Sequence, residues 1–180
     1  MAETPAETMR SEHAIILRVV DYLPALSQQA REGRPLSELQ IPRFVEFFRN
    51  YADRFHHAKE EELLFPFMEA HDVPHQGCPI SALLHEHASS RNCVAKLDHF
   101  TEIGEPLNSE QADEFVHLLD QMHKLYHDHI WKEDEMVFPM LDRIAHKPEL
   151  KDLAEEFGKA GRRSEFAGID KLVSFADTLS

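Results

Sequence analysis

Cysteine and glycine are scarce in this chain of 180 residues, which holds only 2 Cys and 6 Gly. Cys78 and Cys93 do not form a CxxC pair, and two thiols in a chain of this length do not indicate a disulfide scaffold. Both thiols are expected to be buried or chemically idle. Because Glu, Leu and Ala are common while glycine is rare, the composition favours helices over strands. We therefore predict an all-α fold.

Positive charge is also in short supply, since 19 Lys and Arg face 33 Asp and Glu and leave a net charge of -14. Such a chain repels nucleic-acid phosphates and anionic lipid surfaces. The opening stretch MAETPAETMRSEH has no basic region followed by an apolar one, and no apolar run reaches the length of a membrane span. We expect a cytoplasmic protein that binds neither nucleic acid nor membranes.

Four segments carry apolar residues at steps of three or four, which is the spacing of one helix face. Ser11 and Ser109 are suitable N-caps for the first and last segments, and Pro24 is expected to kink the first. The stretches HDVPHQGCP and IGEPLNSE contain Pro and Gly and are predicted loops. The predicted helices cover about residues 11–29, 37–67, 80–97 and 109–140.

Four helices with short connections pack most simply as an antiparallel up-down bundle. A chain of this length supports one hydrophobic core, so we predict a single bundle over residues 1–147. The remaining residues 148–180 are predicted to be a short helix and a tail, the helix opening at Pro148 and closing at Gly158. Whether the tail packs on the bundle is left open by the sequence.

Histidine is abundant, with 13 residues, and several of them lie in a repeated pattern. Residues 56–66 read HHAKEEELLFP, and residues 129–139 read HIWKEDEMVFP, 73 positions later. The dipeptide Glu-His is also repeated, at positions 12–13 and 86–87, with an offset of 74. The agreement of the two offsets indicates an imperfect duplication of a helical hairpin.

The repeated residues lie on the inward faces of the predicted helices. His56 with Glu60, and His129 with Glu133, are four residues apart and so share a helix face. Burying such groups unpaired costs on the order of several kcal/mol per ion, against a total stability of roughly 5–15 kcal/mol. Divalent cations remove this cost. Imidazole and carboxylate ligands without a thiolate suit iron, manganese or zinc, and helical bundles hold pairs of such ions bridged by carboxylates.

In their order and spacing, the two H-x-x-x-E elements that end in Phe-Pro and the two Glu-His elements resemble the hemerythrin-like HHE cation-binding domain. The resemblance covers about residues 9–146 and implies a non-haem di-iron site, oxo- or hydroxo-bridged, with zinc or manganese as possible substitutes. It implies that Glu60 and Glu133 bridge the ions. The implied ligands are His13, His56, Glu60, His87, His129 and Glu133.

The marine oxygen carriers of this family have HxxxH on the third helix and HxxxxD on the fourth. In this chain Arg91 stands four residues after His87, whereas Asp134 stands five residues after His129. The missing second histidine argues against oxygen carriage. It moves the resemblance towards bacterial HHE proteins and the iron-centre repair and iron-sensing branches.

Other polar residues near the pattern are assigned to less central places. His57 and Glu61 are expected on the flank of their helix, where the face is more polar. His123 and His127 form an HxxxH pair that we expect at the surface or in a supporting role. Tyr126 lies one turn before the fourth histidine, where it either fills the core or donates a hydrogen bond to a metal-bound oxygen.

Three functions agree with these residues. The leading hypothesis is a di-iron protein that binds, senses or reduces a small ligand such as O2, NO or peroxide. The alternative is an iron store, donor or sensor that acts through a protein partner and is related to iron-centre repair. A zinc-stabilised bundle without reactivity is the third. Whether the protein is an enzyme, and whether it is a monomer or a dimer, stay open.

Overall fold

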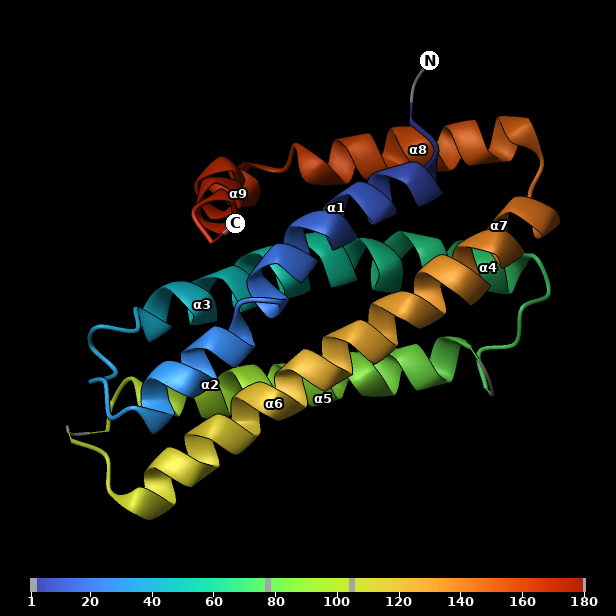
Figure 1. Ribbon diagram of the computed structural model, residues 1–180. Helices are drawn as coiled ribbons and strands as arrows, with labels where there is room; N and C mark the ends of the chain where they lie inside the picture. The colour runs from blue at the N-terminus through green and yellow to red at the C-terminus, as the bar shows by residue number, and fades with distance from the viewer. Residues whose placement is uncertain (1–2, 77–78, 104–105, 180) are drawn as a thin grey trace.

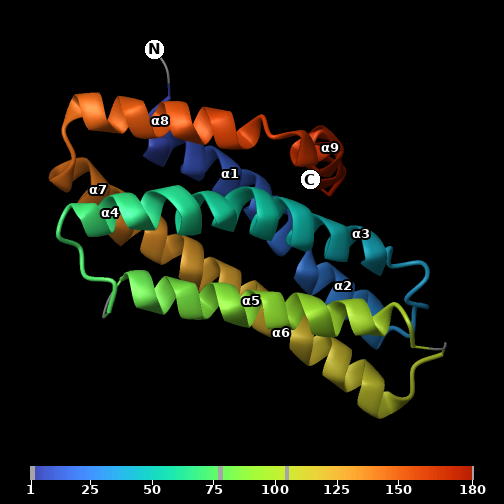
Figure 2. The ribbon, with the colours of Figure 1, turned by 180° about the vertical axis from the view of Figure 1, so that it is seen from behind.

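The computed structural model describes residues 3–76, 79–103 and 106–179, and within these ranges the chain forms helices and no strands. Its long helical segments run alternately in opposite directions, so the fold is the predicted antiparallel up-down bundle (Figures 1 and 2). No helix in these ranges is long and apolar enough to cross a membrane. The prediction for Cys78 falls outside the described residues, and Cys93 is half-buried.

Each of the four rods is built from one or more consecutive helical segments. Three of these segments, η1, η2 and η3, are π-helical, and the other segments of the rods are α-helices. In chain order the segments are α1 (Pro5–Val20) and α2 (Leu23–Arg31), then α3 (Ile41–Phe47), η1 (Phe48–His57), η2 (Glu60–Leu64) and α4 (Phe65–Ala70), then α5 (Ile80–Phe100), and finally α6 (Ser109–Lys132), η3 (Glu133–Val137) and α7 (Phe138–Ile144).

The first rod differs from the predicted kinked helix over residues 11–29. It begins earlier, because Thr4 and Glu7 form a capping box that satisfies the first backbone N–H groups. Ser11 lies inside α1, where its hydroxyl donates to the carbonyl of Glu7. Pro24 has no N–H to continue the hydrogen-bond pattern, so the rod divides into α1 and α2 instead of bending within one helix.

The two π-helical segments η2 and η3 stand directly before the repeated Phe-Pro pairs. In both, the residue before the proline donates its N–H to the carbonyl five residues earlier, which belongs to Glu60 or to Glu133. Pro66 and Pro139 lack an N–H and their rings crowd the preceding turn, which favours this wider turn. The duplicated proline therefore places a π-turn at both predicted bridging glutamates.

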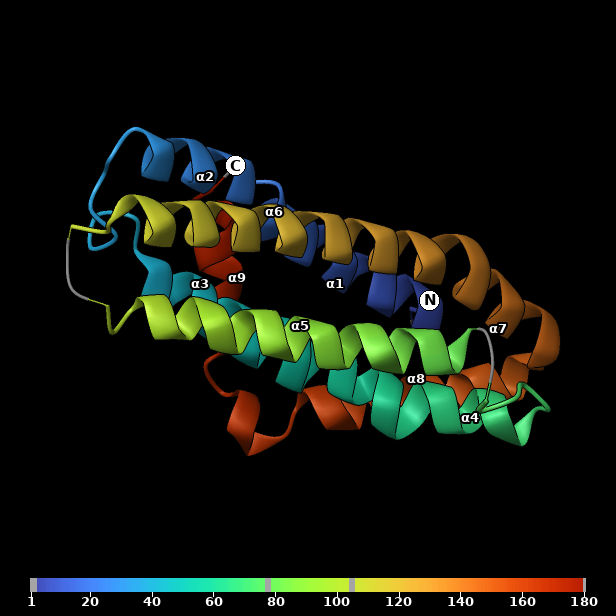
Figure 3. The ribbon, with the colours of Figure 1, turned by 90° about the horizontal axis from the view of Figure 1, so that it is seen from below.

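The C-terminal residues pack on the bundle, which the sequence had left open. The predicted helix 148–159 is longer at both ends and passes through Gly158. This C-terminal helix contacts α1 and η2 of the bundle, and the last helix of the chain contacts α1 and α3 (Figure 3). There the ring of Phe175 meets the ring of Phe44 edge to face at 5.1 Å. These segments are α8 (Lys147–Gly161), a 3-10 turn η4 (Ser164–Phe166) and α9 (Ile169–Asp177).

Two apolar clusters fill the bundle and leave a polar layer between them. On α1, for example, Met9 belongs to the cluster near α7 and α8, and Ile16 belongs to the larger cluster near α2 and α3. His13 lies between them along the same helix face and is 1% exposed. Charged groups in this layer are therefore shielded from water on both sides, which strengthens their mutual interactions.

Candidate metal centre

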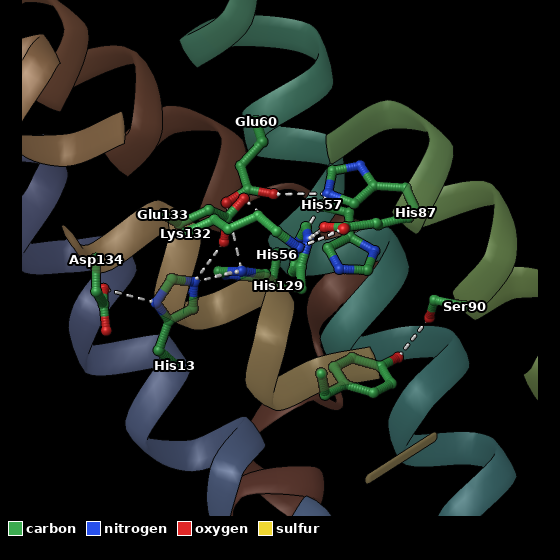
Figure 4. A network of polar contacts seen from close by, with 12 residues as sticks. His13, His56, His57, Glu60, His87, Ser90, His129, Lys132, Glu133 and Asp134 are labelled. Atoms are coloured by element: carbon green, nitrogen blue, oxygen red, sulfur yellow. Dashed lines mark hydrogen bonds and ion pairs between the residues drawn. The ribbon is translucent and has the colours of Figure 1, made fainter. Parts of the chain in front are cut away.

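The six residues predicted as metal ligands converge in this polar layer (Figure 4). Each is at most 3% exposed, so the site lies in the interior of the bundle. Every rod contributes at least one residue, and η2 of the second rod and η3 of the fourth rod each bring a carboxylate. The residues are His13 on α1, His56 on η1, Glu60 on η2, His87 on α5, His129 on α6 and Glu133 on η3.

The two glutamates each face two histidines. One oxygen of Glu60 is 3.5 Å from His56 Nε2 and the other is 3.2 Å from His87 Nε2. The oxygens of Glu133 lie 3.0 Å from His13 Nε2 and 3.4 Å from His129 Nε2. Each carboxylate thus spans the two halves of the site, as a bridging ligand would.

The four histidines form two close pairs. The Nε2 atoms of His13 and His56 are 3.1 Å apart, and those of His87 and His129 are 3.3 Å apart. One group with metal-binding geometry contains the first pair with both glutamates, and a second group contains the second pair with Glu60. Within each group the ligand atoms lie within 4.8 Å of one another. The arrangement offers two neighbouring cation positions.

Each of these imidazoles also contacts a carboxylate through its other ring nitrogen, Nδ1, at 2.7–3.0 Å. An Nδ1–H that donates to a carboxylate leaves the Nε2 lone pair directed to the centre of the bundle. Two of these carboxylates precede a predicted ligand histidine and two follow a predicted ligand glutamate. The pairs are His13 with Asp134, His56 with Glu12, His87 with Glu61, and His129 with Glu86.

Two lysines complete this supporting network. Lys59 pairs with Glu12, and Lys132 pairs with Glu86, in matching positions of the two halves. Lys59 is only 4% exposed, and its ammonium lies 3.6 Å from the ring centre of Phe55. The repeated Glu-His dipeptide served only to place the histidines, and the sequence alone gave no role to its glutamate or to the lysine before each predicted bridging glutamate. Their repetition at the offsets of the histidines was the available signal.

The carboxylate oxygens of Glu60 and Glu133 are buried and have no hydrogen bond of acceptable geometry, although imidazole nitrogens lie nearby. Burial and the charge of Glu133 raise the pKa of Glu60 to about 7. For Glu133, burial is outweighed by the neighbouring histidines, chiefly His129, which lower its pKa to about 2. The two carboxylates can only accept hydrogen bonds, and they lie among imidazole lone pairs that point to the same centre. A cation would satisfy both kinds of group, so this set of ligand atoms fits divalent metal ions.

In the metal-free protein, protons on two of the histidines supply part of the positive charge that metal ions would bring. Burial disfavours the imidazolium of His13, but the hydrogen bond to Asp134 and the negative charge of Glu133, 3.0 Å away, outweigh burial and raise its pKa to about 10. The same balance, with the negative charge of Glu60 and a hydrogen bond to Glu61, raises the pKa of His87 to about 9. Metal binding must displace these protons, since a ligating imidazole donates a lone pair.

The expected flank position of His57 is wrong. Its side chain is 1% exposed, its ring stacks on that of His87 at 3.9 Å, and its Nδ1 has no hydrogen-bond partner. The prediction assumed 3.6 residues per turn, which rotates neighbouring side chains by about 100°. The inward face of a packed helix is at least about 100° wide, so two consecutive residues are buried together here, as are His129 and Ile130 at the matching positions of α6. His57 joins Glu60, His87 and His129 in the second metal-binding group.

The remaining predicted residues lie around this centre. The Tyr126 hydroxyl is 2.6 Å from the hydroxyl of Ser90, and its ring is 6.4 Å from that of His57. Glu61, expected on the flank, is only partly exposed and serves as the acceptor for His87. His123 and His127 lie on the outer side of α6, partly exposed.

Comparison with known proteins agrees with this geometry. The family model of the hemerythrin HHE cation-binding domain matches residues 4–141, more than three quarters of the chain. Neither the curated proteins nor the solved structures include a match to the chain. The matched span contains both hairpins and all six converging side chains. The chain is a member of the hemerythrin HHE cation-binding family.

Proposed function

We propose that this protein holds two non-haem iron ions and binds, senses or reduces a small ligand such as O2, NO or peroxide. The proposal rests on the pair of glutamates, Glu60 and Glu133. Each directs one carboxylate oxygen to the first pair of histidines and the other oxygen to the second pair. Iron held there would supply redox and Lewis-acid chemistry. Six side chains divided over two ions leave coordination positions for an external ligand.

The chain's own groups would set the properties of such a centre. The carboxylates behind the imidazoles hold each Nε2 toward the interior and increase its basicity. The apolar clusters on both sides keep bulk water away from the ligands. We infer that residues 1–147 form the metal-holding unit and that residues 148–180 are a C-terminal addition, of which α8 covers α1 and η2 from outside.

The test is reconstitution with Fe(II) without oxygen, followed by metal analysis and exposure to air, NO or hydrogen peroxide. We expect two iron ions per chain and a change of the optical spectrum with at least one of these ligands. Glu133→Gln should lower the iron content, because it removes a charged bridging ligand. Glu135→Gln is the matched control, since Glu135 is exposed two residues away.

Two outcomes would contradict the proposal. A protein that binds two iron ions but whose spectrum does not respond to O2, NO or peroxide would not be a ligand-binding centre. Zinc as the metal in protein purified from unsupplemented cells, together with failure to take up iron, would instead favour a zinc-stabilised bundle. Equal iron content in Glu133→Gln and Glu135→Gln would reject the ligand assignment.

A second function, as an iron donor or sensor that acts through a protein partner, is favoured by one surface feature. Trp131 and Met136 are large apolar residues that are 60% and 45% exposed. They lie on α6 and η3, the segments that also carry His129 and Glu133. Exposed apolar side chains of this size are common at protein interfaces.

The two functions are separated by a pull-down from cells with iron-loaded and metal-free protein. A partner retained in only one metal state, and lost in Trp131→Ala, would support the donor or sensor function. Turnover of the small ligand by the isolated protein would support the first function, because it requires no partner.

A further inference from the structure

We propose that Asp21, His123 and His127 form a second metal site, on the outer surface of the bundle, that takes one divalent cation of the zinc type. One ligand atom of each residue lies within 4.8 Å of the other two. This site shares no residue with the buried centre. Its donor set of two imidazoles and one carboxylate suits zinc and neighbouring late first-row metals.

The histidine pair is held by a regular helix. His123 and His127 are four residues apart on α6, which is α-helical from Ser109 to Lys132 and turns π-helical only afterwards. Their rings lie with centres 4.6 Å apart and planes at 54°. Histidines at this spacing lie on the same helix face one turn apart, as in helical zinc-binding motifs.

The third group comes from a different rod and is held in place by the fold. Asp21 ends α1, where its backbone N–H donates to the carbonyl of Leu17, and the two residues before it are fully buried. Its carboxylate oxygen Oδ1 lies 2.8 Å from His127 Nε2, across 106 positions of sequence. Because α2 then packs along α6, the end of α1 is fixed beside the histidine pair.

The size of the site agrees with a small cation. Tetrahedral zinc with bonds of about 2.0–2.1 Å places its ligand atoms roughly 3.3 Å from one another. The observed separations, 2.8 Å for His127 with Asp21 and at most 4.8 Å overall, reach that value by side-chain rotation. His127 is 41% exposed and Asp21 59% exposed, so both side chains have room to rotate, and a water molecule would complete the coordination of the cation.

Occupancy of this site would join the end of α1 to α6. The same two segments carry His13 and His129, one histidine from each pair of the buried centre. A cation bound at the surface would therefore restrain two of the rods that position the proposed iron ligands, without contacting those ligands.

The experiment is a titration of iron-loaded protein with Zn²⁺, followed by calorimetry and by the imidazole resonances of His123 and His127. Wild-type protein should take up one equivalent of Zn²⁺ with those resonances shifting, and iron analysis afterwards should show no displacement. His123→Ala and His127→Ala should each weaken this uptake by about tenfold or more. His117→Ala is the matched control, because His117 is an exposed histidine on the same helix.

The proposal is overturned if both histidine variants bind Zn²⁺ as wild type does, or if His117→Ala weakens binding equally. Unchanged thermal midpoints of the variants without zinc would show that they fold normally, as expected for substitutions at partly exposed positions. If the protein takes up no iron, the same comparison is made with Zn²⁺ alone. The variants should then bind one equivalent less than wild type, which separates this site from the buried one.

Discussion

Replacement of Glu12 by glutamine removes one charge behind the metal centre and leaves all six proposed ligands in place. The carboxylate accepts a hydrogen bond from His56 Nδ1 at 3.0 Å and pairs with Lys59. A glutamine of the same shape is a weaker acceptor and does not raise the basicity of the imidazole. Loss of such a partner lowers metal affinity by about 10–100-fold, or roughly 1.4–2.7 kcal/mol.

The same substitution should also destabilise the metal-free protein. Lys59 is 4% exposed, so its ammonium would keep only a neutral partner in the interior. We expect a loss of about 1–3 kcal/mol from the free energy of unfolding. In the double variant Glu12→Gln with Lys59→Met the buried charge is gone, so stability should largely return while metal affinity stays low.

The duplicated half supplies a matched control. Glu86 accepts a hydrogen bond from His129 as Glu12 does from His56. Its lysine partner Lys132 is 32% exposed, however, so the ammonium of Lys132 stays in contact with water. Glu86→Gln should therefore lower metal affinity and change the unfolding free energy less than Glu12→Gln does, because solvent screens the unpaired lysine.

The assays are Fe(II) competition against a chelator and urea unfolding of the metal-free protein. Wild-type iron affinity in a folded Glu12→Gln variant would refute the supporting role of this carboxylate. Equal losses of stability in Glu12→Gln and Glu86→Gln would refute the argument from burial.

Three further outcomes are expected. Metal loading at pH about 8 should release about two protons, which an indicator dye records, because the pKa values of His13 and His87 are raised to about 10 and about 9. Both pKa values lie above the ordinary value of histidine, so at a pH below them protons compete with the metal for these imidazoles. Metal affinity should therefore rise as the pH approaches these values, and an affinity that does not change with pH would contradict this. Phe175→Ala should lower the unfolding free energy by about 3–5 kcal/mol without changing iron content, because it opens a cavity under α9. Tyr126→Phe should lower the free energy of unfolding by about 1–2 kcal/mol, since it leaves the hydroxyl of Ser90 unpaired. A changed iron spectrum would instead indicate that the tyrosine hydroxyl contacts the small molecule bound to the metal.

The fold and the six converging side chains followed from periodicity and repetition. Helix faces depend on local spacing, so His56 with Glu60, and His129 with Glu133, could be placed on inward faces before any tertiary contact was known. The duplication then located His13 and His87 through the repeated Glu-His pair. Buried polar residues in an apolar stripe are costly, which made a cation the consistent explanation.

The width of a buried helix face and the ends of the helices were harder to predict. His57 faces inward beside His56 because the buried face of a packed helix is wide enough to hold two consecutive residues, as it also does at His129 and Ile130. The first rod starts at a Thr4 cap rather than at Ser11, since both residues are suitable caps and only the observed hydrogen bonds choose between them.

The amino-acid sequence by itself determined the all-helical bundle, its internal duplication and the identity of the six inward histidines and glutamates, because these depend on spacing along single helices. Only the tertiary structure decided which carboxylate stands behind which imidazole. Asp134 reaches His13 across 121 positions and Glu61 reaches His87 from another rod. Such pairings depend on the relative shift and rotation of packed helices, which side-chain packing across the whole bundle sets.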